Sequence, residues 1–344
     1  MTIVRAWVTE HEGKMAATVR TARSAWRQRR SLVLHLEDST GALGRGEASP
    51  LPGYSTETLE ECRRALDGLD WAAGTRSKSL PSAAQFAVDT AVLDLQSQSQ
   101  ARPTWNLLAQ QVPPRIPLCK VLHTRDPQAL RDDCAEATEH GYRCFKLKIG
   151  IDAASDLERC RTIRRLLPAV EIRLDANRAF ARDEASRLLA PFRELGCAFV
   201  EEPWSDPKLV DDLADLVALV ESSPLPVALD ESLRHPGAPS AVRFVAERVP
   251  LGALVLKPMA LGGIAVVRDF AVLGNDLGVP IVLSHLFDGP LAHAAAQALA
   301  LAFGSPEVAA GLAPHDGLTA WTATNLPGGI GSWVTPWSSP GVLP

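Results

Sequence analysis

Five ionisable residues recur at an almost constant spacing, and this spacing limits the fold more than any other feature of the sequence. Each ends a short apolar run: Lys148, Asp175, Glu201, Asp230 and Lys257. The successive gaps are 27, 26, 29 and 27 residues, close to the length of one strand plus one helix. In a closed parallel barrel such residues face one common mouth, where the active sites of barrels lie. A single Asp or Lys there would be read as a helix cap or loop residue. Five in series predict a shared site.

Short apolar runs alternate with amphipathic stretches of helical length from residue 116 onward. The candidate strands are residues 116–121, 144–148, 171–175, 198–201, 227–230, 253–257, 280–284 and 308–312. This alternation predicts an α/β fold, a (β/α) TIM-type barrel of seven or eight βα units. A doubly wound open sheet is the alternative, but it would carry a glycine-rich loop after its first strand, and residues 120–126 contain no glycine.

The first 112 residues differ in texture and predict a separate α+β capping domain. Residues 3–9 and 31–37 are rich in Val, Leu and Trp, and turn residues lie at 40–46, as in an antiparallel meander. We expect helices next, one capped by Ser55 and one over residues 81–95. The predicted domains are therefore a capping domain (1–112), a catalytic barrel (113–318) and a tail (319–344) that returns toward the capping domain.

Charge and composition narrow the classes of partner. The net charge is −5 without a long basic or acidic block, which gives no reason to expect nucleic acid or an anionic membrane surface. The first 30 residues lack the apolar stretch of a signal peptide, and no window has the length of a membrane-spanning helix. The six cysteines are irregularly spaced without a Cys-x-x-Cys pair, which is typical of reduced thiols. We expect a cytoplasmic protein with a small-molecule partner, and the oligomeric state stays open.

The carboxylates at the strand ends predict a metal site. Asp175, Glu201 and Asp230 come from consecutive candidate strands and supply only oxygen ligands, which suit Mg²⁺ better than Zn²⁺ or copper. Without a cation, three clustered carboxylates would repel one another and their pKa values would rise. We therefore expect Mg²⁺ as the cofactor.

The lysines predict a base. Lys146 and Lys148 are separated by one residue, so both side chains point to the same face of their strand. The neighbouring ammonium and the metal ion disfavour protonation, which leaves one lysine as a free amine. Lys148, nearer the mouth, is the expected base and Lys146 its electrostatic neighbour, while Lys257 arrives from the opposite side. A salt-bridge network between lysines and carboxylates is the alternative. A metal-stabilised enediolate makes a proton next to a carboxylate removable, so this residue set favours proton abstraction.

These motifs are similar to those of the enolase superfamily, in particular its muconate-lactonizing subgroup. The matching segments are Phe145-Lys146-Leu147-Lys148, Leu174-Asp175-Ala176-Asn177, Val200-Glu201-Glu202-Pro203, Leu229-Asp230-Glu231-Ser232 and Leu256-Lys257-Pro258. Within the subgroup, residues 173–179 and 46–55 resemble the o-succinylbenzoate synthase family most. The resemblance covers nearly the whole chain. Its motif set is highly specific for the superfamily and less so for one reaction.

The resemblance implies a capping domain on a modified barrel and a syn-dehydration in menaquinone biosynthesis. The substrate would be 2-succinyl-6-hydroxy-2,4-cyclohexadiene-1-carboxylate, which loses its α-proton to Lys148 and then hydroxide to give 2-succinylbenzoate. Mg²⁺ would hold the enediolate, and Lys257 would lie against the other face of the ring as a cation. Loops of the capping domain, here residues 16–30 and 49–55, would close the mouth.

The resemblance also implies substrate contacts near the metal ligands and after the seventh strand. Arg173 and Asn177, beside Asp175, would be polar contacts or support for the metal site. Ser284 and His285 are the other candidates. The segment from Ser284 to Asp288 departs from the serine-rich run of many family members, so His285 either meets the succinyl tail or packs behind the rim.

Three alternatives stay open. An N-acylamino acid racemase or dipeptide epimerase of the same superfamily would exchange one proton between two lysines on opposite faces. Dipeptide epimerases usually show an Asp-x-Asp pair after the last strands, whereas Asp288 stands alone here. His315-Asp316 is similar to the His-Asp pair that acts as the catalytic base in mandelate racemase relatives. Lys257 on the sixth strand argues against that subgroup, so we interpret His315 as structural. The third alternative is a non-catalytic, metal-stabilised barrel.

Overall fold

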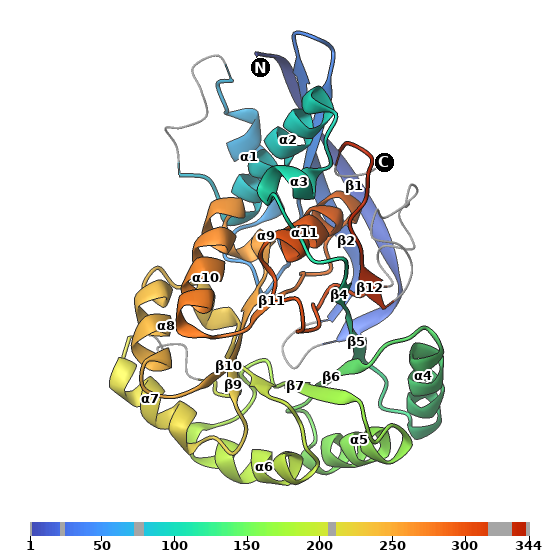
Figure 1. The fold of residues 1–344 in the computed structure, drawn as a ribbon, viewed down its shortest axis with the longest axis vertical. Coiled ribbons are helices and arrows are strands. Elements are labelled where there is room, and N and C mark those ends of the chain that lie inside the picture. Colours follow the sequence, from blue (N-terminus) through green and yellow to red (C-terminus); the bar gives the residue numbers. More distant parts are fainter. Residues whose placement is uncertain (1, 21–24, 72–78, 206–210, 316–331, 342–344) are drawn as a thin grey trace.

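The computed structural model describes residues 2–20, 25–71, 79–205, 211–315 and 332–341. It shows a curled parallel sheet with helices on its outer side, and above it an antiparallel sheet with its own helices (Figure 1). The predicted α/β barrel with an N-terminal α+β capping domain is thereby confirmed. The doubly wound alternative is excluded, because the parallel strands follow one another in sequence order across the sheet.

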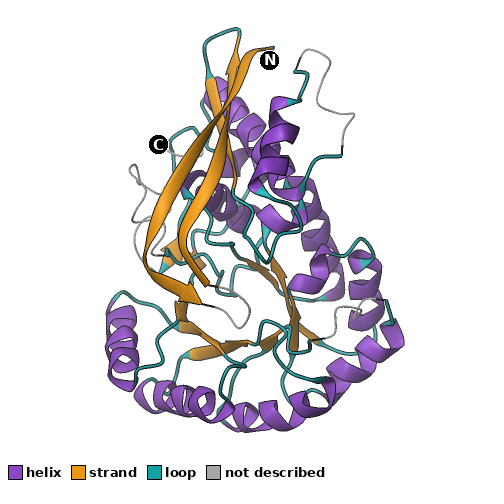
Figure 2. Cartoon of the chain, turned by 180° about the vertical axis from the view of Figure 1, so that it is seen from behind, coloured by secondary structure: helices purple, strands orange, loops and turns teal. Residues whose placement is uncertain are grey.

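A long hairpin dominates the capping domain and extends toward the barrel (Figure 2). The elements of the capping domain are β1 (Ile3–Arg20), β2 (Ala25–Asp38), β3 (Leu43–Ala48), α1 (Leu59–Asp67), α2 (Ser82–Gln100) and α3 (Thr104–Leu108), and β1 and β2 form the hairpin. The hairpin is longer than the predicted apolar runs because backbone pairing continues through polar residues, from Ile3 opposite Asp38 to Arg20 opposite Ala25. The expected cap at Ser55 is wrong. Thr58 caps α1 in a reciprocal capping box with Glu61.

The capping sheet packs on α2 through two glycines of β3. A Cβ atom added at Gly46 would lie 1.9 Å from the carbonyl oxygen of Ala87, and one at Gly44 would lie 2.3 Å from that of Ala91. Only glycine permits this approach of strand to helix. The close packing fixes the segment that follows β3, residues 49–55, above the barrel.

The barrel sheet has the order β11-β10-β9-β8-β7-β6-β5, with every neighbouring pair parallel. The strands are β5 (Cys119–Leu122), β6 (Cys144–Lys148), β7 (Glu171–Asp175), β8 (Val200–Glu201), β9 (Val227–Leu229), β10 (Leu251–Leu256) and β11 (Ile281–Leu283). The helices are α4 (Pro127–Glu139), α5 (Ala153–Leu166), α6 (Arg182–Glu194), α7 (Leu213–Ser222), α8 (Ala238–Ala246), α9 (Pro258–Leu261), α10 (Ile264–Leu277) and α11 (Pro290–Phe303), with a 3-10 turn at Glu231–Arg234. Aspartates cap α4, α5 and α7.

The predicted eighth strand, residues 308–312, is not a strand in the structure. This segment forms two isolated parallel bridges, one between Ala310 and Leu118 and one between Gly311 and Ser284. Its backbone hydrogen bonds are divided between two strands. The Ala310 carbonyl accepts the Cys119 N–H of β5 at 2.8 Å, and the Gly311 N–H donates to the Leu283 carbonyl of β11 at 2.8 Å. The segment therefore closes the gap between β5 and β11 without forming a ladder with either.

The described part of the C-terminal tail packs against the start of the barrel and against the capping helices. The first predicted strand is split into β4 (Ile116–Pro117) and β5, and β4 pairs antiparallel with β12 (Trp333–Val334) of the tail. The Trp105 indole donates to the carbonyl of Trp337 at 2.8 Å. The Gly341 N–H donates to the Ser97 hydroxyl of α2 at 2.7 Å.

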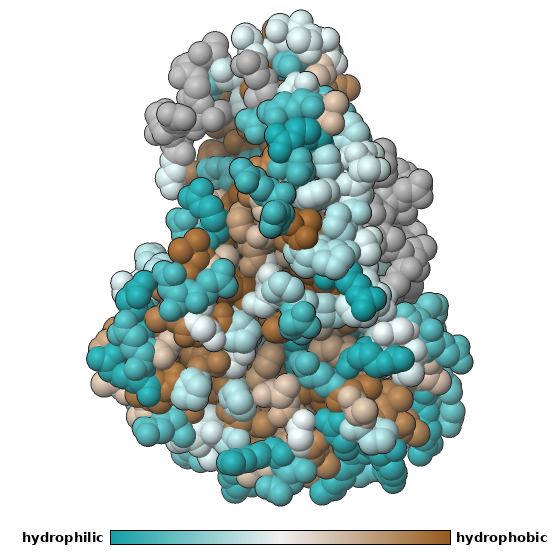
Figure 3. Space-filling model, in the orientation of Figure 1, coloured by the Kyte–Doolittle hydropathy of each residue, from teal (hydrophilic) through white to brown (hydrophobic). Residues whose placement is uncertain are grey.

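The outer surface mixes hydrophilic and hydrophobic residues, and hydrophobic ones show between the barrel helices on the face seen in Figure 3. Leu166 of α5 and Val272 of α10 are among the exposed hydrophobic side chains. Scattered exposure of this kind is normal for a folded domain. In the described part of the chain, no helix combines the length and the apolar character that a membrane crossing requires.

Candidate active site

Lys146 and Lys148 project from the same face of β6, as alternate residues of a strand do. Lys146 Nζ lies 3.0 Å from Glu201 Oε2 and 3.2 Å from Asp175 Oδ2. Lys148 Nζ donates to Asn177 Oδ1 at 3.1 Å and lies 3.8 Å from Asp175 Oδ2. Lys146 is therefore held between two carboxylates, whereas Lys148 has a neutral acceptor and one more distant carboxylate.

The three carboxylates come from consecutive strands, in the arrangement that the spacing predicted. Strand pairing sets Lys148 beside Asp175 and Asp175 beside Glu201, while Asp230 directly follows β9. Each carboxylate residue is only 2% exposed. Buried anions of this kind require compensating cations or a metal ion.

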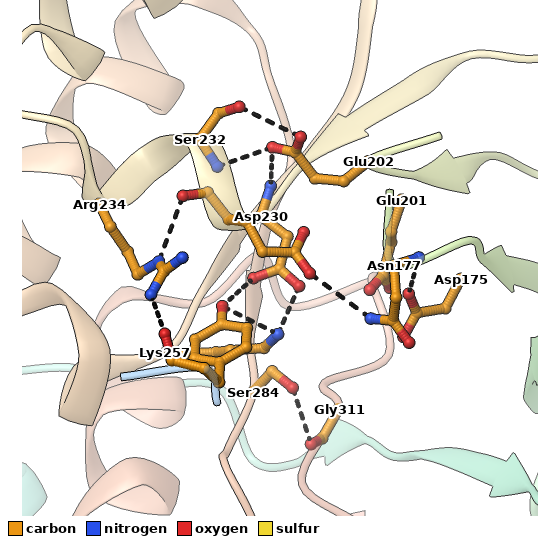
Figure 4. Close-up of polar contacts among 12 residues, drawn as sticks. Asp175, Asn177, Glu201, Glu202, Asp230, Ser232, Arg234, Lys257, Ser284 and Gly311 are labelled. Carbon is orange, nitrogen blue, oxygen red and sulfur yellow. Dashed lines mark hydrogen bonds and ion pairs between the residues drawn. The ribbon is translucent and has the colours of Figure 1, made fainter. Parts of the chain in front are cut away.

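Asp230 forms a separate group with Lys257, as Figure 4 shows. Tyr54 belongs to the same group. Lys257 Nζ makes a short ion pair with Asp230 Oδ2, and the Tyr54 hydroxyl donates to Asp230 Oδ1 at 3.0 Å. Lys257 Nζ also lies 4.7 Å from the centre of the Tyr54 ring, and the guanidinium of Arg234 lies 4.4 Å from it. Because Tyr54 belongs to the capping domain, both domains meet at this carboxylate.

The donor set fits a hard divalent cation. Asp175, Glu201 and Asp230 offer carboxylate oxygens alone, which Mg²⁺ prefers. Here the protein's own cations compensate these anions, with Lys146 on the first two and Lys257 on the third. Among the described residues, the three carboxylates do not bring their oxygens together as a ready metal site. A metal ion held by all three would have to replace part of these lysine contacts.

The two lysines of β6 have opposite pKa shifts. Burial disfavours the charged form of both. At Lys146, attraction to Asp175 and Glu201 outweighs burial, and the pKa lies above its ordinary value. At Lys148, burial prevails over attraction to Asp175, with help from the positive charge of Lys146, and the pKa is lowered. Lys148 is thus the lysine of this strand that is more easily a free amine.

Glu202, which the sequence singled out only as part of a motif, organises the turn that carries Asp230. Its Oε1 accepts the backbone N–H groups of Asp230 at 3.0 Å and of Ser232 at 2.9 Å. Its Oε2 accepts the Ser232 hydroxyl at 3.1 Å and Arg178 Nε at 3.3 Å. Glu202 has a φ of +35°, a left-handed conformation uncommon for this residue type. The doubled glutamate before Pro203 was the sequence signal for this role.

A pocket opens between the strand ends and the capping domain. It is lined by nine of the ten predicted site residues, namely Lys146, Lys148, Arg173, Asp175, Asn177, Glu201, Lys257, Ser284 and His285. The tenth, Asp230, is bonded to Tyr54 and Lys257, which do line it. Sequence reasoning missed Trp26, Phe287 and Arg234, because no local pattern distinguishes them from ordinary core or surface residues.

Arg173 and Ser284 line the pocket, but each donates a hydrogen bond to the segment that closes the barrel. Arg173 donates to Glu171 Oε1 at 2.5 Å and to the carbonyl of Ala309 at 2.6 Å. The Ser284 hydroxyl donates to the carbonyl of Gly311 at 3.3 Å. Both residues thus hold segment 308–312 in place, and their predicted substrate contacts stay predictions. Asn177, by contrast, directly orients Lys148.

His285 and His315 line the pocket beside the loop between β11 and α11, and the ring of His293 contacts both of them without lining it. The rings of His285 and His315 stack with centroids 5.0 Å apart, and His293 lies 5.1 Å from His285. Burial lowers the pKa of His293 to about 4 and that of His315 to about 3. Burial also lowers the pKa of His285 well below its ordinary value, so this pocket wall is neutral around pH 7.

The hydrogen bonds of this wall argue against a metal ion on the three rings, although their ligand atoms lie within 4.8 Å of one another. The backbone N–H of Phe287 donates to His285 Nδ1 at 2.9 Å, so the neutral ring carries its proton on Nε2. His293 Nε2 faces the carbonyl of Leu312 and His315 Nε2 that of Asp288. With the lone pair of His285 occupied, these tautomers do not offer three lone pairs to one ion.

Comparison with known proteins gives two family matches and many relatives. Residues 129–330 match the family described as enolase C-terminal domain-like, and residues 7–95 match the MenC N-terminal domain. The L-Lys-D/L-Arg epimerase of Methylococcus capsulatus is 30% identical over 291 residues, 79% of each chain. The o-succinylbenzoate synthase of Enterobacter sp. (strain 638) is 31% identical over 272 residues, 76% of each chain.

Solved structures agree on the fold. The dipeptide epimerase of Enterococcus faecalis V583, complexed with Mg and the dipeptide L-Leu-L-Tyr, superimposes with a TM-score of 0.85 over 99% of both chains. Its sequence identity of 20% makes this a likeness of fold alone.

Proposed function

The chain belongs to the enolase superfamily, and from this premise we propose that it is an o-succinylbenzoate synthase, a Mg²⁺-dependent lyase of the cytoplasm. The proposed reaction is the syn-dehydration of 2-succinyl-6-hydroxy-2,4-cyclohexadiene-1-carboxylate to 2-succinylbenzoate in menaquinone biosynthesis. The match of residues 7–95 to the MenC N-terminal domain supports this choice within the superfamily.

The charge of the pocket is the observation that carries the proposal. Among the described lining residues, the cations are Lys120, Lys146, Lys148, Arg173, Arg178, Arg234 and Lys257, and the carboxylates are Asp175, Glu201 and Glu231. Two of these carboxylates are proposed metal ligands, which leaves Glu231 as the one carboxylate of this lining for an ammonium group. Such a lining favours a dianionic substrate over a dipeptide with a free amino group.

Lys148 is the proposed base. As a free amine it takes the α-proton, and the C–H electron pair moves into the carboxylate as an enediolate. The resulting Lys148 ammonium then returns that proton to the leaving hydroxyl group on the same face, so water departs as the C–O bond breaks and the ring becomes aromatic. One lysine thus serves both halves of a syn elimination, and Asn177 holds its amine in place.

Lys257 is proposed to act as a cation on the other side of the substrate. It stands after β10, four strands along the sheet from β6, and so approaches the pocket from the opposite side. Its interaction with the Tyr54 ring shows that its environment accommodates a cation over an aromatic face. Attraction to Asp230 overcomes its burial and raises its pKa, which keeps it charged.

The proposed metal ligands are Asp175, Glu201 and Asp230. A bound Mg²⁺ would supply positive charge for the enediolate. The chain's own contribution is to place these carboxylates beside the ammonium groups of Lys146 and Lys257 and to exclude water from them, as the ion pairs and the burial indicate.

Epimerisation is the second candidate, and the relative from Methylococcus capsulatus favours it. With Lys148 and Lys257 on opposite sides, one lysine can remove a proton and the other can return a different one. This route would require Lys257 to lose its proton, which the pair with Asp230 opposes.

One experiment in D₂O separates the two candidates. The protein with Mg²⁺ is given the cyclohexadiene in one sample and dipeptides with basic side chains, or N-succinylamino acids, in the others. We expect 2-succinylbenzoate to form, which its ultraviolet absorbance detects. We also expect the recovered dipeptide to contain little deuterium, which mass spectrometry measures. Rapid deuterium incorporation with racemisation, and no dehydration, would overturn the proposal in favour of an epimerase. The Lys148→Ala variant is the control for chemistry at this site.

A further inference from the structure

Arg29 is a buried cation of the capping domain that joins it to the barrel without lining the pocket. It stands on β2 and is 2% exposed. Its guanidinium donates to the backbone carbonyls of Ser49, of Pro50 at 3.1 Å and of Phe287 at 3.1 Å. Ser49 and Pro50 belong to the capping domain, whereas Phe287 lies in the loop between β11 and α11. One side chain thus ties a capping strand to a loop of the pocket wall.

A second residue of the capping sheet reaches the same loop. Glu47 of β3 is fully buried and accepts the backbone N–H groups of Gly289 at 2.9 Å and of Ala292 at 3.1 Å. These groups belong to the N-terminal turn of α11, where a carboxylate is favourable. Asp288, also fully buried, stands between Phe287 and Gly289 in the sequence, and its carboxylate attracts the Arg29 guanidinium electrostatically. Arg29 is therefore the cation that compensates two buried carboxylates at this junction.

Phe287 is held in a backbone conformation that it would not adopt by itself. Its φ is +55°, which is strained for a bulky residue and persists only where the surroundings impose it. Its N–H is bound to His285, and its carbonyl is bound to Arg29. Its ring meets those of His285 and His315 edge-on, at centroid distances of 5.8 and 5.4 Å. Loss of the Arg29 bond removes one of the contacts that impose this conformation.

We propose that Arg29 is a positioning residue: by holding the Phe287 carbonyl it fixes the wall of His285, Phe287 and His315, which lines the same pocket as the lysines, and so sets substrate affinity without touching the substrate. Arg29 does not contact the lysines or the proposed metal ligands. Its effect on turnover therefore passes through the Phe287 backbone. The affinity part of this inference rests on the proposed function, whereas the positioning of Phe287 does not.

Variants at Arg29 and its neighbour test this role. Arg30 follows Arg29 in sequence but is exposed and pairs with Glu10, so Arg30→Met is the matched control. We expect Arg29→Met to raise KM for the cyclohexadiene roughly tenfold while kcat changes less than about threefold. The KM of Arg29→Lys should fall between those of Arg29→Met and the wild type. A lysine ammonium keeps the positive charge but lacks the planar guanidinium that donates to several carbonyls at once. The Mg²⁺ concentration for half activity should not change.

Hydrogen exchange at the Phe287 amide gives a readout that needs no turnover. The amide should exchange faster in Arg29→Lys than in the wild type or Arg30→Met. If Arg29→Met does not fold, because Glu47 and Asp288 lose their cation, the lysine variant alone decides. A lysine variant with unchanged KM and unchanged exchange would overturn the inference, even with a lower melting temperature. A wild type without dehydratase activity refutes the proposed function, and the exchange comparison still decides the role of Arg29.

Discussion

Lys146 and Lys148 share one face of β6 but lie in opposite electrostatic environments. Lys146 has carboxylate oxygens of Asp175 and Glu201 at 3.2 and 3.0 Å, whereas Lys148 has a single carboxylate oxygen at 3.8 Å. Burial lowers the pKa of Lys148, and the two carboxylates override burial at Lys146. The strand thus separates two chemically identical side chains into a structural cation and a candidate base.

Replacing Lys148 by alanine should remove turnover and leave the metal site intact. We expect kcat to fall by about a thousandfold or more, because general acid–base groups contribute on the order of 10²–10⁴ and this lysine serves both proton transfers. Mg²⁺ binding by calorimetry should stay near that of the wild type. Lys14→Ala, at an exposed position of β1, is the control. Full turnover in Lys148→Ala would show that Lys148 is not the base.

Replacing Glu202 by glutamine should weaken the metal site without touching its ligands. The amide nitrogen of glutamine would face the donors of Ser232 and Arg178, so the turn that carries Asp230 loses part of its support. We expect Mg²⁺ affinity to fall by about 10–100-fold, as for other residues that support metal ligands. Calorimetric titration with Mg²⁺ measures this, with the exposed Glu194→Gln as the control. Equal affinities would show that Glu202 has only a structural role. Activity that survives a chelator would refute the metal assignment itself.

The strand-end residues were predictable because the chemistry repeats with the period of the fold. Asp175 and Glu201 lie side by side since each ends a strand, and that arrangement follows from sequence spacing alone. Tyr54 and Arg29 were not predictable as partners of Asp230 and Phe287, because these contacts join segments 176 and 258 residues apart. No local periodicity encodes such contacts. Segment 308–312 shows a related limit: its place was predicted, but not that its bonds divide between two neighbours.

Asp288 should make stability depend on pH. Burial, and then repulsion from Glu47, raises its pKa to about 7, against about 3.9 in an unfolded chain. Between these values the folded protein holds a proton that the unfolded chain has lost, so stability falls as pH rises through this window and levels off above it. The full penalty is on the order of 4 kcal/mol, at about 1.4 kcal/mol per pH unit.

The Asp288→Asn variant tests that dependence because it keeps the shape and removes the charge. The free energy of unfolding of Asp288→Asn minus that of the wild type should be larger at pH 8 than at pH 5 by roughly 2–4 kcal/mol, because only the wild type loses stability as pH rises. Urea denaturation at both pH values measures the difference, and Asp269→Asn at the exposed end of a surface ion pair is the control. The same difference between Asp288→Asn and wild type at both pH values would contradict the assigned pKa.

The chain contains two tyrosines, which allows a matched test of how the capping domain acts on the site. Tyr54→Phe removes only the hydroxyl that bonds Asp230, and the ring stays beside Lys257 and Arg234. Hydrogen bonds to charged groups contribute about 1.5–3 kcal/mol, so we expect kcat/KM to fall roughly 10–100-fold. Tyr142→Phe, which alters the other tyrosine in the same way, should leave kcat/KM unchanged.

Tyr54→Ala separates the ring from the hydroxyl. It also removes the aromatic face beside two cations, and cation–π contacts that are shielded from water contribute up to about 2 kcal/mol. We therefore expect a further loss of roughly tenfold or more beyond Tyr54→Phe. If Tyr54→Phe keeps wild-type kcat/KM and only Tyr54→Ala loses it, the hydroxyl on Asp230 is dispensable. The capping domain would then act on Lys257 through the ring alone, because Tyr54→Phe retains the ring and its place between Lys257 and Arg234.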